Sequence, residues 1–482
     1  MKKEKNKVAF YTLGCKVNAY ETNVMIDIFK NNGYEIVDFN EVADVYVVNT
    51  CTVTSMSDKK SRQILRRAKH LNPNSVLCAV GCYAQVAKSE LEKIDDIDII
   101  LGTIEKKDIL KKIADHMPKN NANIEFMESK VSDDKINKQK NIIDKQKNIM
   151  VENIMKVRAY DEFDGTAYTT HARAEVKIQD GCDRFCSYCI IPYARGPVRS
   201  RKPEEIINEI KRIVASGVKE IVITGIHISS YGKDFKYSNL NFDNRFDAQG
   251  AHIQAAQPIV DDILSSPKYG LIDLLESINK IDGIARIRLG SLEPRIITEE
   301  FVKRLVKLDK ICNHFHLSLQ SGCDETLKRM NRKYTTAEFK NIVSLLRKNI
   351  PEVALTTDVI VGFPGETDEE FNKTVEFLKE VEFSKMHIFK YSKRKGTPAA
   401  TFPNQVSDNK KEERSNVLLD LSDKNEENFA KKYINKEVEV LFENAEEGHT
   451  TNYLKVIRSN KNEASEIKSV IVREWKNGAL YV

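Results

Sequence analysis

The sequence predicts an α/β protein with an N-terminal open parallel sheet, a central partial (β/α)6 barrel and a small C-terminal β-barrel. Strand runs alternate with helical runs in residues 1–116, and six strand signals with helices between most of them recur in residues 171–405. Short runs of period two, split by turns, fill residues 434–482. A chain of 482 residues, 41% of them hydrophobic, can bury about three such cores.

Two connecting segments complete the predicted domain division. Residues 117–170 form a linker with an insert rich in Lys and Asn, in which residues 136–142 are nearly duplicated as residues 143–149. Two seven-residue copies are too few for a coiled coil, so we expect a flexible or transiently helical connection. Residues 406–433 are highly charged and predict a helical linker, and an insert at about 235–267 predicts a surface loop.

The N-terminal domain repeats a strand followed by a helix. Its strand signals are residues 8–12, 44–49 and 75–80, and its helical signals are residues 18–32, 57–70 and a stretch from about residue 88. This alternation predicts a parallel sheet that is covered on both faces. Ligands bind such a sheet at the carboxyl ends of its strands.

Three cysteines follow the three strand signals of this domain. Cys15, Cys51 and Cys82 come after the first, second and third signal, so the fold can bring them to one edge of the sheet. Three converging thiols suggest an iron-sulfur cluster with one open iron, although scattered cysteines alone leave the question undecided. Cys78 lies inside a strand signal and is interpreted as a buried packing residue.

A second group of cysteines follows the first strand signal of the barrel, which covers residues 174–178. Cys182, Cys186 and Cys189 have the spacing C-x3-C-x2-C. Three thiolates this close can ligate three irons of a cubane, whereas a fourth ligand would close an electron-transfer cluster, so one iron is left for a substrate. The alternative is a structural zinc site, but zinc needs four ligands and His171 is too far upstream to serve.

The remaining strand signals of the barrel are residues 220–224, 285–289, 314–319, 353–361 and 385–389. Catalytic groups in such barrels come from the carboxyl ends of strands, so Gly225, Ser291 and Gln320 are cofactor-binding candidates. The segment Gly362-Phe-Pro-Gly365 serves a tight turn as readily as a close approach to a ligand. Cys312 and Cys323 are interpreted as packing residues.

The chain resembles the radical S-adenosylmethionine (radical SAM) methylthiotransferases over nearly its whole length. The resemblance rests on residues 11–18 (YTLGCKVN), 49–54 (NTCTVT), 81–82 (GC) and 181–200, in this order. It implies SAM and two [4Fe-4S] clusters: a radical cluster on the C-x3-C-x2-C loop, and an auxiliary, sulfur-carrying cluster on the three N-terminal cysteines. It also implies that Tyr188 fills the usual aromatic position of the loop, and that Arg332 lies near the carboxylate of SAM.

Within this family the sequence looks most like the branch that acts on N6-threonylcarbamoyladenosine next to the tRNA anticodon. The alternatives are the branches that act on isopentenyladenosine or on an aspartate of a ribosomal protein. An alternative of another class is a non-enzymatic iron-sulfur sensor that binds RNA. The resemblance implies tRNA, an external electron donor and a sulfur source as partners, and the sequence identifies neither the donor nor the source.

Basic residues near the cysteines are candidates for contact with a polyanion. Arg195, Arg199 and Arg201 directly follow the cluster loop, although they can instead pair with acids such as Glu204 and Glu205. The residues after Cys51 form a basic stripe at helical spacing. This stripe can contact phosphate groups, or it can be an ordinary solvated helix face, and the sequence favours neither interpretation. The stripe consists of Lys59, Arg62, Arg66 and Lys69.

The C-terminal β-barrel resembles a TRAM domain, which implies RNA binding. Its candidate contacts are Tyr453, Lys455, Arg458 and Lys461. The alternative is a barrel that only packs on the rest of the chain.

Overall charge and cysteine use fit a cytoplasmic protein. A net charge of +5 and a pI near 8.5 permit a polyanionic partner without requiring one. The sequence shows no signal peptide and no apolar run near 18 residues, and nine cysteines in a long chain are typical of a reducing compartment. We therefore expect a cytoplasmic location and no membrane partner.

Overall fold

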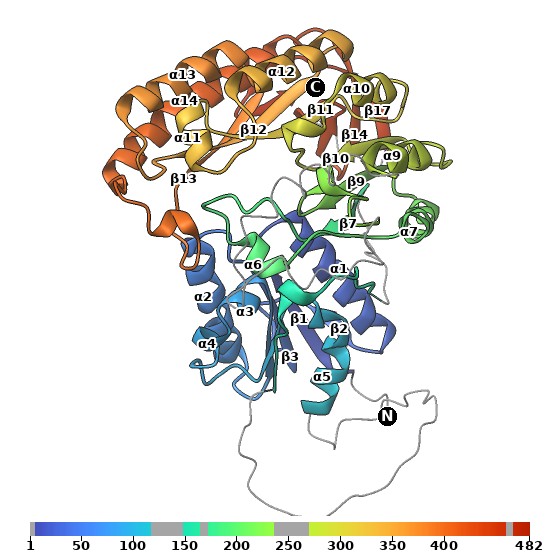
Figure 1. The fold of residues 1–482 in the computed structure, drawn as a ribbon. Coiled ribbons are helices and arrows are strands. Elements are labelled where there is room, and N and C mark those ends of the chain that lie inside the picture. Colours follow the sequence, from blue (N-terminus) through green and yellow to red (C-terminus); the bar gives the residue numbers. More distant parts are fainter. Residues whose placement is uncertain (1–4, 117–147, 164–171, 236–268, 459–465) are drawn as a thin grey trace, which may run out of the picture. The chain divides into compact units, whose positions relative to one another are not determined.

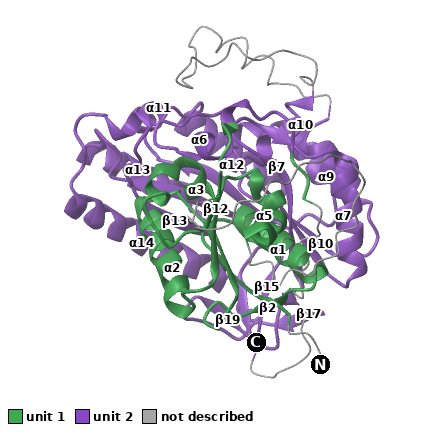
Figure 2. Cartoon of the chain, turned by 90° about the horizontal axis from the view of Figure 1, so that it is seen from below, with its two compact units in different colours: residues 1–154, 161–166 green, residues 155–160, 167–482 purple. Residues whose placement is uncertain are grey.

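The chain folds into two compact units (Figures 1 and 2). The computed structural model describes residues 5–116, 148–163, 172–235, 269–458 and 466–482. Unit 1 comprises residues 1–154 and 161–166, and unit 2 comprises residues 155–160 and 167–482. No helix within the described ranges is long and apolar enough to cross a membrane.

Unit 1 contains a parallel sheet with the order β2-β1-β3-β4-β5-β6 among its described residues. The strands are β1 (Lys7–Thr12), β2 (Glu35–Val37), β3 (Val45–Thr50), β4 (Val76–Gly81), β5 (Ile99–Leu101) and β6 (Asn148–Met150). The helices are α1 (Lys16–Asn31), α2 (Ser55–Leu71), α3 (Cys82–Val86), α4 (Lys88–Leu91) and α5 (Ile109–His116), and a 3-10 turn, η1, spans Glu105–Asp108. The predicted parallel α/β sheet is confirmed.

The strands that the sequence did not predict are the short ones. β2, β5 and β6 have three residues each, which is too few for a periodic signal. β6 lies inside residues 117–170, the predicted linker, and the end of the second duplicate copy, Asn148–Ile149, belongs to it. Part of that segment therefore completes the edge of the sheet instead of only connecting two domains.

Unit 2 contains the predicted six strands with helices between them. The strands are β7 (Arg173–Asp180), β9 (Glu220–Gly225), β10 (Arg286–Leu289), β11 (His314–Gln320), β12 (Ala354–Val361) and β13 (Lys385–Lys390). In the described part of the chain they pair in parallel as β7-β9-β10 and β11-β12-β13. Bridges Ile287–Ile311 and Leu292–Leu317 join the two rows, so the strands follow the chain order expected of a partial barrel.

Helices pack the apolar side chains of these strands into one core. They are α7 (Pro203–Ala215), α9 (Leu271–Asn279), α10 (Glu299–Leu305), α11 (Asp324–Arg329), α12 (Thr336–Asn349) and α13 (Asp368–Val381). A further short helix, α6 (Ile191–Arg195), lies between β7 and α7 in the chain. Capping boxes start two of them, Thr335 with Glu338 at α12 and Thr367 with Glu370 at α13. A short strand, β8 (Arg199–Ser200), runs antiparallel to β7.

The C-terminal region consists of a long helix and a second sheet. Helix α14 (Asp408–Lys431) lies within residues 406–433, and its Leu418 is part of the barrel core. The strands are β14 (Glu437–Phe442), β15 (Glu447–Thr450), β16 (Lys455–Ile457), β17 (Glu466–Ile471), β18 (Glu474–Lys476) and β19 (Ala479–Tyr481). Within the described residues their order is β17-β14-β15-β16-β19-β18, and all pairs are antiparallel except β16 with β19.

The C-terminal sheet packs on the amino-terminal ends of the barrel strands through charged and aromatic groups. Arg288 of β10 donates to the carbonyl oxygens of Thr450 (3.2 Å) and Thr451 (3.0 Å) and forms two bonds to the buried carboxylate of Glu220. The Tyr453 ring lies 4.6 Å from the Arg288 guanidinium. A polar junction therefore joins the last domain to the barrel.

Candidate active site

The C-x3-C-x2-C loop follows β7 and has a tightly fixed backbone. The Cys182 N–H donates to the Gly196 carbonyl oxygen (2.9 Å), and the Cys189 N–H donates to that of Cys186 (2.9 Å). Gly181 has a φ of 73°, and a Cβ at this position would lie 1.8 Å from a backbone carbonyl oxygen. Only glycine fits there, so the backbone sets the directions in which the cysteine side chains leave the loop.

The last residue of α11 and the residues just after it hold the loop from one side. The Ser187 hydroxyl donates to the Arg329 carbonyl oxygen (2.7 Å), and the Ser187 N–H donates to that of Met330 (3.1 Å). The Asn331 side-chain amide donates to the Phe185 carbonyl oxygen (3.0 Å). The segment 330–332, which includes the predicted cofactor residue Arg332, therefore lies directly against the cysteine loop.

Arg332 reaches a cysteine sulfur of the loop. Its Nη1 lies 3.3 Å from Cys186 Sγ, its Nη2 donates to the Ser318 carbonyl oxygen (2.9 Å), and its Nε donates to the Tyr334 hydroxyl (2.9 Å). N–H donors stabilise a ligating thiolate and help to set the reduction potential of an iron-sulfur cluster. The sequence predicted Arg332 near a cofactor carboxylate, and the structure places its guanidinium at a cysteine of the loop.

The three thiols of the loop affect one another's ionisation. Burial raises the pKa of Cys182 well above its usual range, and the charge of Cys186 raises it further. Burial and Cys186 also raise the pKa of Cys189, which Arg332 opposes. Cys186 is buried and Cys182 and Cys189 are partly exposed, and three thiolates this close together need a cation among them, which an iron-sulfur cluster supplies. The donor set therefore fits a cluster.

Tyr188 of the loop packs on the Gly362–Gly365 segment. Its ring lies 6.4 Å from that of Phe363 in an edge-on arrangement, next to the buried Met330 and Ala399. Gly362 has a φ of 68°, and a Cβ there would lie 2.2 Å from Cγ of Lys411 on α14. Packing against α14 is thus sufficient reason for this glycine, and the structural interpretation of the segment is favoured.

The other cofactor candidates lie at the carboxyl edge of the barrel, where the cysteine loop also begins. Gly225 ends β9, and a Cβ there would lie 2.9 Å from the Gln179 carbonyl oxygen. Gln320 ends β11 with a φ of 74° and is buried. Ser291 follows β10 and is exposed. The structure brings these three residues to one edge of the strands, as the parallel order predicts.

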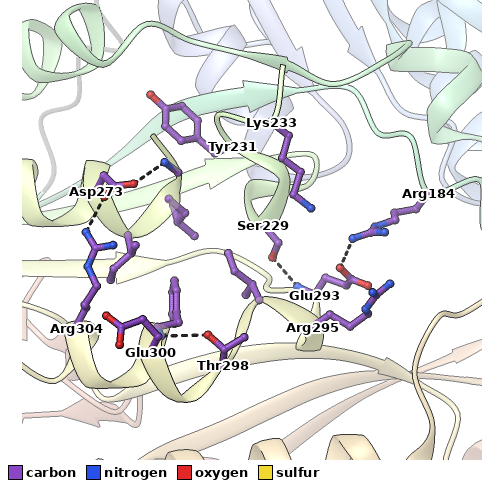
Figure 3. Close-up of a pocket in the computed structure, with 15 residues that line it drawn as sticks. Arg184, Ser229, Tyr231, Lys233, Asp273, Glu293, Arg295, Thr298, Glu300 and Arg304 are labelled. Carbon is purple, nitrogen blue, oxygen red and sulfur yellow. Dashed lines mark hydrogen bonds and ion pairs between the residues drawn. The ribbon is translucent and has the colours of Figure 1, made fainter. Parts of the chain in front are cut away.

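A cavity of about 360 Å³ opens beside the cysteine loop (Figure 3). Arg184, a residue of the loop, donates to Glu293 Oε2 (2.6 Å) at the cavity wall. The Glu293 N–H donates to the Ser229 hydroxyl (2.9 Å), which fixes the segment after β10 to the segment after β9. Lys233 and Arg295 add cationic groups to the lining.

Sequence reasoning missed His227 and Glu293. His227 follows β9, where its N–H donates to Gln179 Oε1 (2.7 Å), and its Nδ1 lies 2.8 Å from the Ser230 hydroxyl. Its Nε2 lies 3.9 Å from Glu293 Oε2. Burial lowers the pKa of His227 to about 3, so the imidazole is neutral at neutral pH. Each residue stands two positions after a predicted candidate, Gly225 or Ser291, and a wider search of the strand ends would have included both.

The three arginines after the loop are buried, so the expectation that they face a polyanion is wrong. Arg195 and Arg199 lie 3.2 and 3.7 Å from Asp180 Oδ2, and Arg201 pairs with Glu209. The alternative interpretation was that these arginines pair with acids, and they do, although their partners are Asp180 and Glu209 and not Glu204 or Glu205. Helix α6 and strand β8 turn this segment inward, which residue spacing does not reveal.

In unit 1, Cys15, Cys51 and Cys82 follow the adjacent parallel strands β1, β3 and β4. A Cβ on Gly14 would lie 2.9 Å from Cys51 Sγ, so the first loop closely approaches the second cysteine. Burial raises the pKa of Cys51, and the charges of Cys82 and Cys15 raise it further, as expected of neighbouring thiols. Cys78 is fully buried inside β4.

The geometry does not favour zinc at either group of cysteines. A single zinc ion with Zn–S bonds of about 2.3 Å draws its sulfur ligands to within about 4 Å of one another. Among the described residues, no group of three or more Cys, His, Asp or Glu side chains is arranged to hold one metal ion. Each group has three free cysteines, which is the number of protein ligands that a cluster with one open iron takes.

The basic stripe on α2 is only partly exposed. Lys69 Nζ lies 2.8 Å from Asp98, and Arg62 donates to the Tyr83 hydroxyl (2.5 Å). Lys59 and Arg66 are exposed. Half of the stripe therefore stabilises the domain and half is accessible.

The predicted RNA contacts of the C-terminal domain are mostly engaged within the protein. Tyr453 faces Arg288, and Arg458 is buried against Phe442 and bonded to Glu466 (2.5 Å). Lys455 pairs with Glu447, and Lys461 lies outside the described residues. Tyr453 and Arg458 therefore serve packing instead of the predicted exposed face.

Comparison with known proteins gives consistent matches over both units. The radical SAM superfamily matches residues 176–378, and an uncharacterized protein family, UPF0004, matches residues 7–102. The chain is 43% identical over 460 residues to the threonylcarbamoyladenosine tRNA methylthiotransferase MtaB of Bacillus subtilis (strain 168), a match that covers 93% of this chain and 90% of that protein.

More distant relatives include both adenosine branches. Identity is 35% to MtaB of Aquifex aeolicus (strain VF5), over 97% of this chain and 100% of that protein. Identity is 34% to the tRNA-2-methylthio-N(6)-dimethylallyladenosine synthase of Clostridium tetani (strain Massachusetts / E88), over 92% of this chain and 86% of that protein. The solved radical SAM methyltransferase TsrM from Kitasatospora setae has a TM-score of 0.51 at 15% identity, over 82% of this chain and 74% of that chain, which shows the fold alone.

Proposed function

Because the chain belongs to the radical SAM methylthiotransferases that modify tRNA, we propose that it adds a methylthio group to C2 of N6-threonylcarbamoyladenosine next to the tRNA anticodon. The observation that carries this choice of substrate is the 43% identity, over 93% of the chain, to the threonylcarbamoyladenosine tRNA methylthiotransferase MtaB of Bacillus subtilis. The cysteine loop after β7, with Arg332 at Cys186, supports the radical part of the reaction.

The chain's own residues give the radical site its properties. Cys182, Cys186 and Cys189 would hold a [4Fe-4S] cluster, which would supply the electron for reductive cleavage of SAM and so give the site its radical chemistry. Arg332 stabilises the Cys186 thiolate by a hydrogen bond. Tyr188 and Phe363 cover one side of the loop with apolar surface, which excludes water.

A second cluster is proposed on Cys15, Cys51 and Cys82. Its support is the position of the three thiols at the carboxyl ends of adjacent strands, together with their electrostatic coupling. The Val53 N–H lies 3.5 Å from Cys51 Sγ and can stabilise a thiolate there. A cluster in this place would carry the sulfur that joins the substrate carbon.

The cavity beside the cysteine loop supports the threonylcarbamoyl substrate. A threonylcarbamoyl group ends in a carboxylate, whereas an isopentenyl group is apolar. Lys233 and Arg295 bring positive charge to the cavity, whose lining also contains the acids Asp273 and Glu300, and the Arg184–Glu293 pair offers polar contacts near the loop. In this proposal Arg295 binds the substrate carboxylate, and Arg295→Gln raises KM for threonylcarbamoyl tRNA while leaving SAM cleavage unchanged.

The C-terminal sheet is proposed to be a TRAM-like β-barrel that contacts tRNA. Its exposed cations Arg473 and Lys476 lie within two residues of Trp475, with the acid Glu474 between Arg473 and Trp475, and Lys468 is also exposed. Cations beside an aromatic ring are a common arrangement for binding a nucleic-acid strand. These residues replace the predicted Tyr453 and Arg458 as RNA-contact candidates.

Mass spectrometry of digested tRNA, from cells with and without the gene, tests the proposal. Deletion should abolish 2-methylthio-N6-threonylcarbamoyladenosine and leave the unthiolated precursor, and Cys51→Ala should reproduce this result. Loss of a methylthio-isopentenyl nucleoside instead would keep the chemistry and change the substrate. An unchanged nucleoside profile, with no cleavage of SAM by the reduced protein, would favour the iron-sulfur sensor.

A further inference from the structure

A buried polar network lies at the base of the three N-terminal cysteine loops. At its centre Lys106, on η1, pairs with Glu21, on α1, and both side chains are fully buried. Lys106 Nζ also donates to Asn49 Oδ1 (3.0 Å). Asn49 is the fifth residue of β3, so a cation on a distant turn reaches the strand that leads to Cys51.

The network joins the first two cysteine loops. Asn49 Nδ2 donates to the Asn18 carbonyl oxygen (3.0 Å) and to the Thr22 hydroxyl (3.0 Å). Asn18 Nδ2 in turn donates to the carbonyl oxygens of Leu13 (2.7 Å) and Thr50 (3.1 Å). The loop before α1 and the end of β3 are therefore fixed to each other by side-chain amides.

The third loop is joined through the end of β3. The Thr50 hydroxyl donates to the Val80 carbonyl oxygen (2.6 Å) and accepts from the Ala84 N–H (3.2 Å). Gly81 has a φ of 100°, and a Cβ there would lie 2.6 Å from Asn49 Oδ1. The turn that carries the third cysteine thus closes directly on the amide that Lys106 holds.

We infer that Lys106, Glu21 and Asn49 are positioning residues for the auxiliary cluster, and that they set the separation of Cys15, Cys51 and Cys82 before a cluster binds. This inference rests on the proposed second cluster. Ligands that come from three separate loops need their supporting residues fixed to about 0.5 Å. The charges of Lys106 and Glu21 cancel, so the pair positions the loops and adds no net charge to the site.

The burial of this ion pair favours a role in specificity over one in stability. Taking two charges out of water costs about as much as their attraction returns, so a buried pair is weak evidence for stability. Its directional bonds do fix one arrangement of the groups around it. Here those groups are the amides and carbonyls of the cysteine loops.

Unit 1 offers a matched control pair. Lys69 Nζ lies 2.8 Å from Asp98 Oδ2, and the two side chains are 10% and 9% exposed. Asp98 also accepts from the Leu77 N–H (2.8 Å), near the start of β4, at the edge of the sheet opposite the cysteines. Removing this pair disturbs a comparable ionic contact in the same sheet without touching the cysteine loops.

The experiment compares Glu21→Gln/Lys106→Met with Asp98→Asn/Lys69→Met after anaerobic reconstitution with iron and sulfide. Iron per chain, the Mössbauer spectrum and thermal unfolding are measured in the full-length protein. Wild type should bind about eight irons. The first double variant should lose about half, while the SAM-cleaving cluster keeps its spectrum, and the control should keep about eight at a similar loss of thermal stability. Thr22→Val, which removes one neutral hydroxyl, should lower auxiliary occupancy partially in a fully folded protein.

Two results would overturn the inference while the proposed function stands. One is full iron content in Glu21→Gln/Lys106→Met with an unchanged auxiliary spectrum. The other is equal iron loss in both double variants, in step with unfolding, with none in Thr22→Val. Wild type that saturates at about four irons would instead refute the second cluster itself, and the inference with it.

Discussion

Replacing Arg288 by Met removes the central ion pair of the junction between the barrel and the C-terminal sheet. Arg288 Nε and Nη2 bind the two carboxylate oxygens of Glu220 at 2.7 and 3.1 Å, and both side chains are at most 1% exposed. The variant leaves the Glu220 carboxylate buried, with Arg173 at 3.9 Å and the charge of Arg286 still acting on it. The bonds to Thr450 and Thr451 are also lost.

Removing one partner of a buried pair costs about 3–5 kcal/mol, because the other charge stays buried without compensation. Arg173 partly compensates Glu220, so we expect the low end, about 3 kcal/mol. The double variant Glu220→Gln/Arg288→Met buries no lone charge and should be more stable than Arg288→Met alone. With a slope of about 2 kcal/mol per molar urea, the single variant should lower the unfolding midpoint by about 1.5 M.

The chain has one tryptophan, Trp475, which lies on β18 of the C-terminal sheet. Its fluorescence during urea unfolding therefore reports on this domain. Arg304→Met is the control, because Arg304 binds Asp273 and Glu276 at 2.7 and 2.8 Å with side chains 29–36% exposed, and should cost less than about 1 kcal/mol. A midpoint for Arg288→Met as close to wild type as that of Arg304→Met would refute the reasoning.

The same pair gives a prediction on pH. Burial by itself would raise the pKa of Glu220, but Arg288 outweighs it and the pKa lies below the usual range. A lowered pKa in the folded state gives stability that is complete above the unfolded value of about 4.3 and is lost as the pH falls through the folded value. Wild type should therefore lose this contribution only below about pH 4, and Glu220→Gln/Arg288→Met should lack that acid-dependent loss.

Three further predictions concern the cofactors and tRNA. Changing Cys182, Cys186 and Cys189 to Ala should remove about half of about eight reconstituted irons, by iron analysis. Arg332→Met should lower the reduction potential of the radical cluster, because it removes a hydrogen-bond donor at Cys186 Sγ. Potentiometric EPR in the absence of SAM measures this potential. An unchanged potential with a changed affinity for SAM would show that Arg332 binds the cofactor instead. A chain ending at Tyr433 should cleave SAM but bind tRNA more weakly and with a shallower salt dependence; unchanged binding and slope would make the sheet structural.

Strand order explains why the cysteine positions could be predicted. Parallel strands place their carboxyl ends at one edge, so Cys15, Cys51 and Cys82 were expected together from strand positions alone. The residues that hold their loops could not be found in this way. Lys106 lies 55 positions after Cys51 in a short charged turn, where a lysine normally faces water, and only its pairing with Glu21 reveals its place.

The charged residues of β10 show a further limit. Arg286 and Arg288 alternate with Ile287 and Leu289, a period-two pattern that correctly indicates one apolar face and one polar face. The pattern suggests that the polar face meets water, yet both arginines are buried under the C-terminal sheet. A half-polar strand shows only that its second face is not part of the main core. Whether water or another domain covers that face depends on contacts about 160 residues away, which periodicity cannot report.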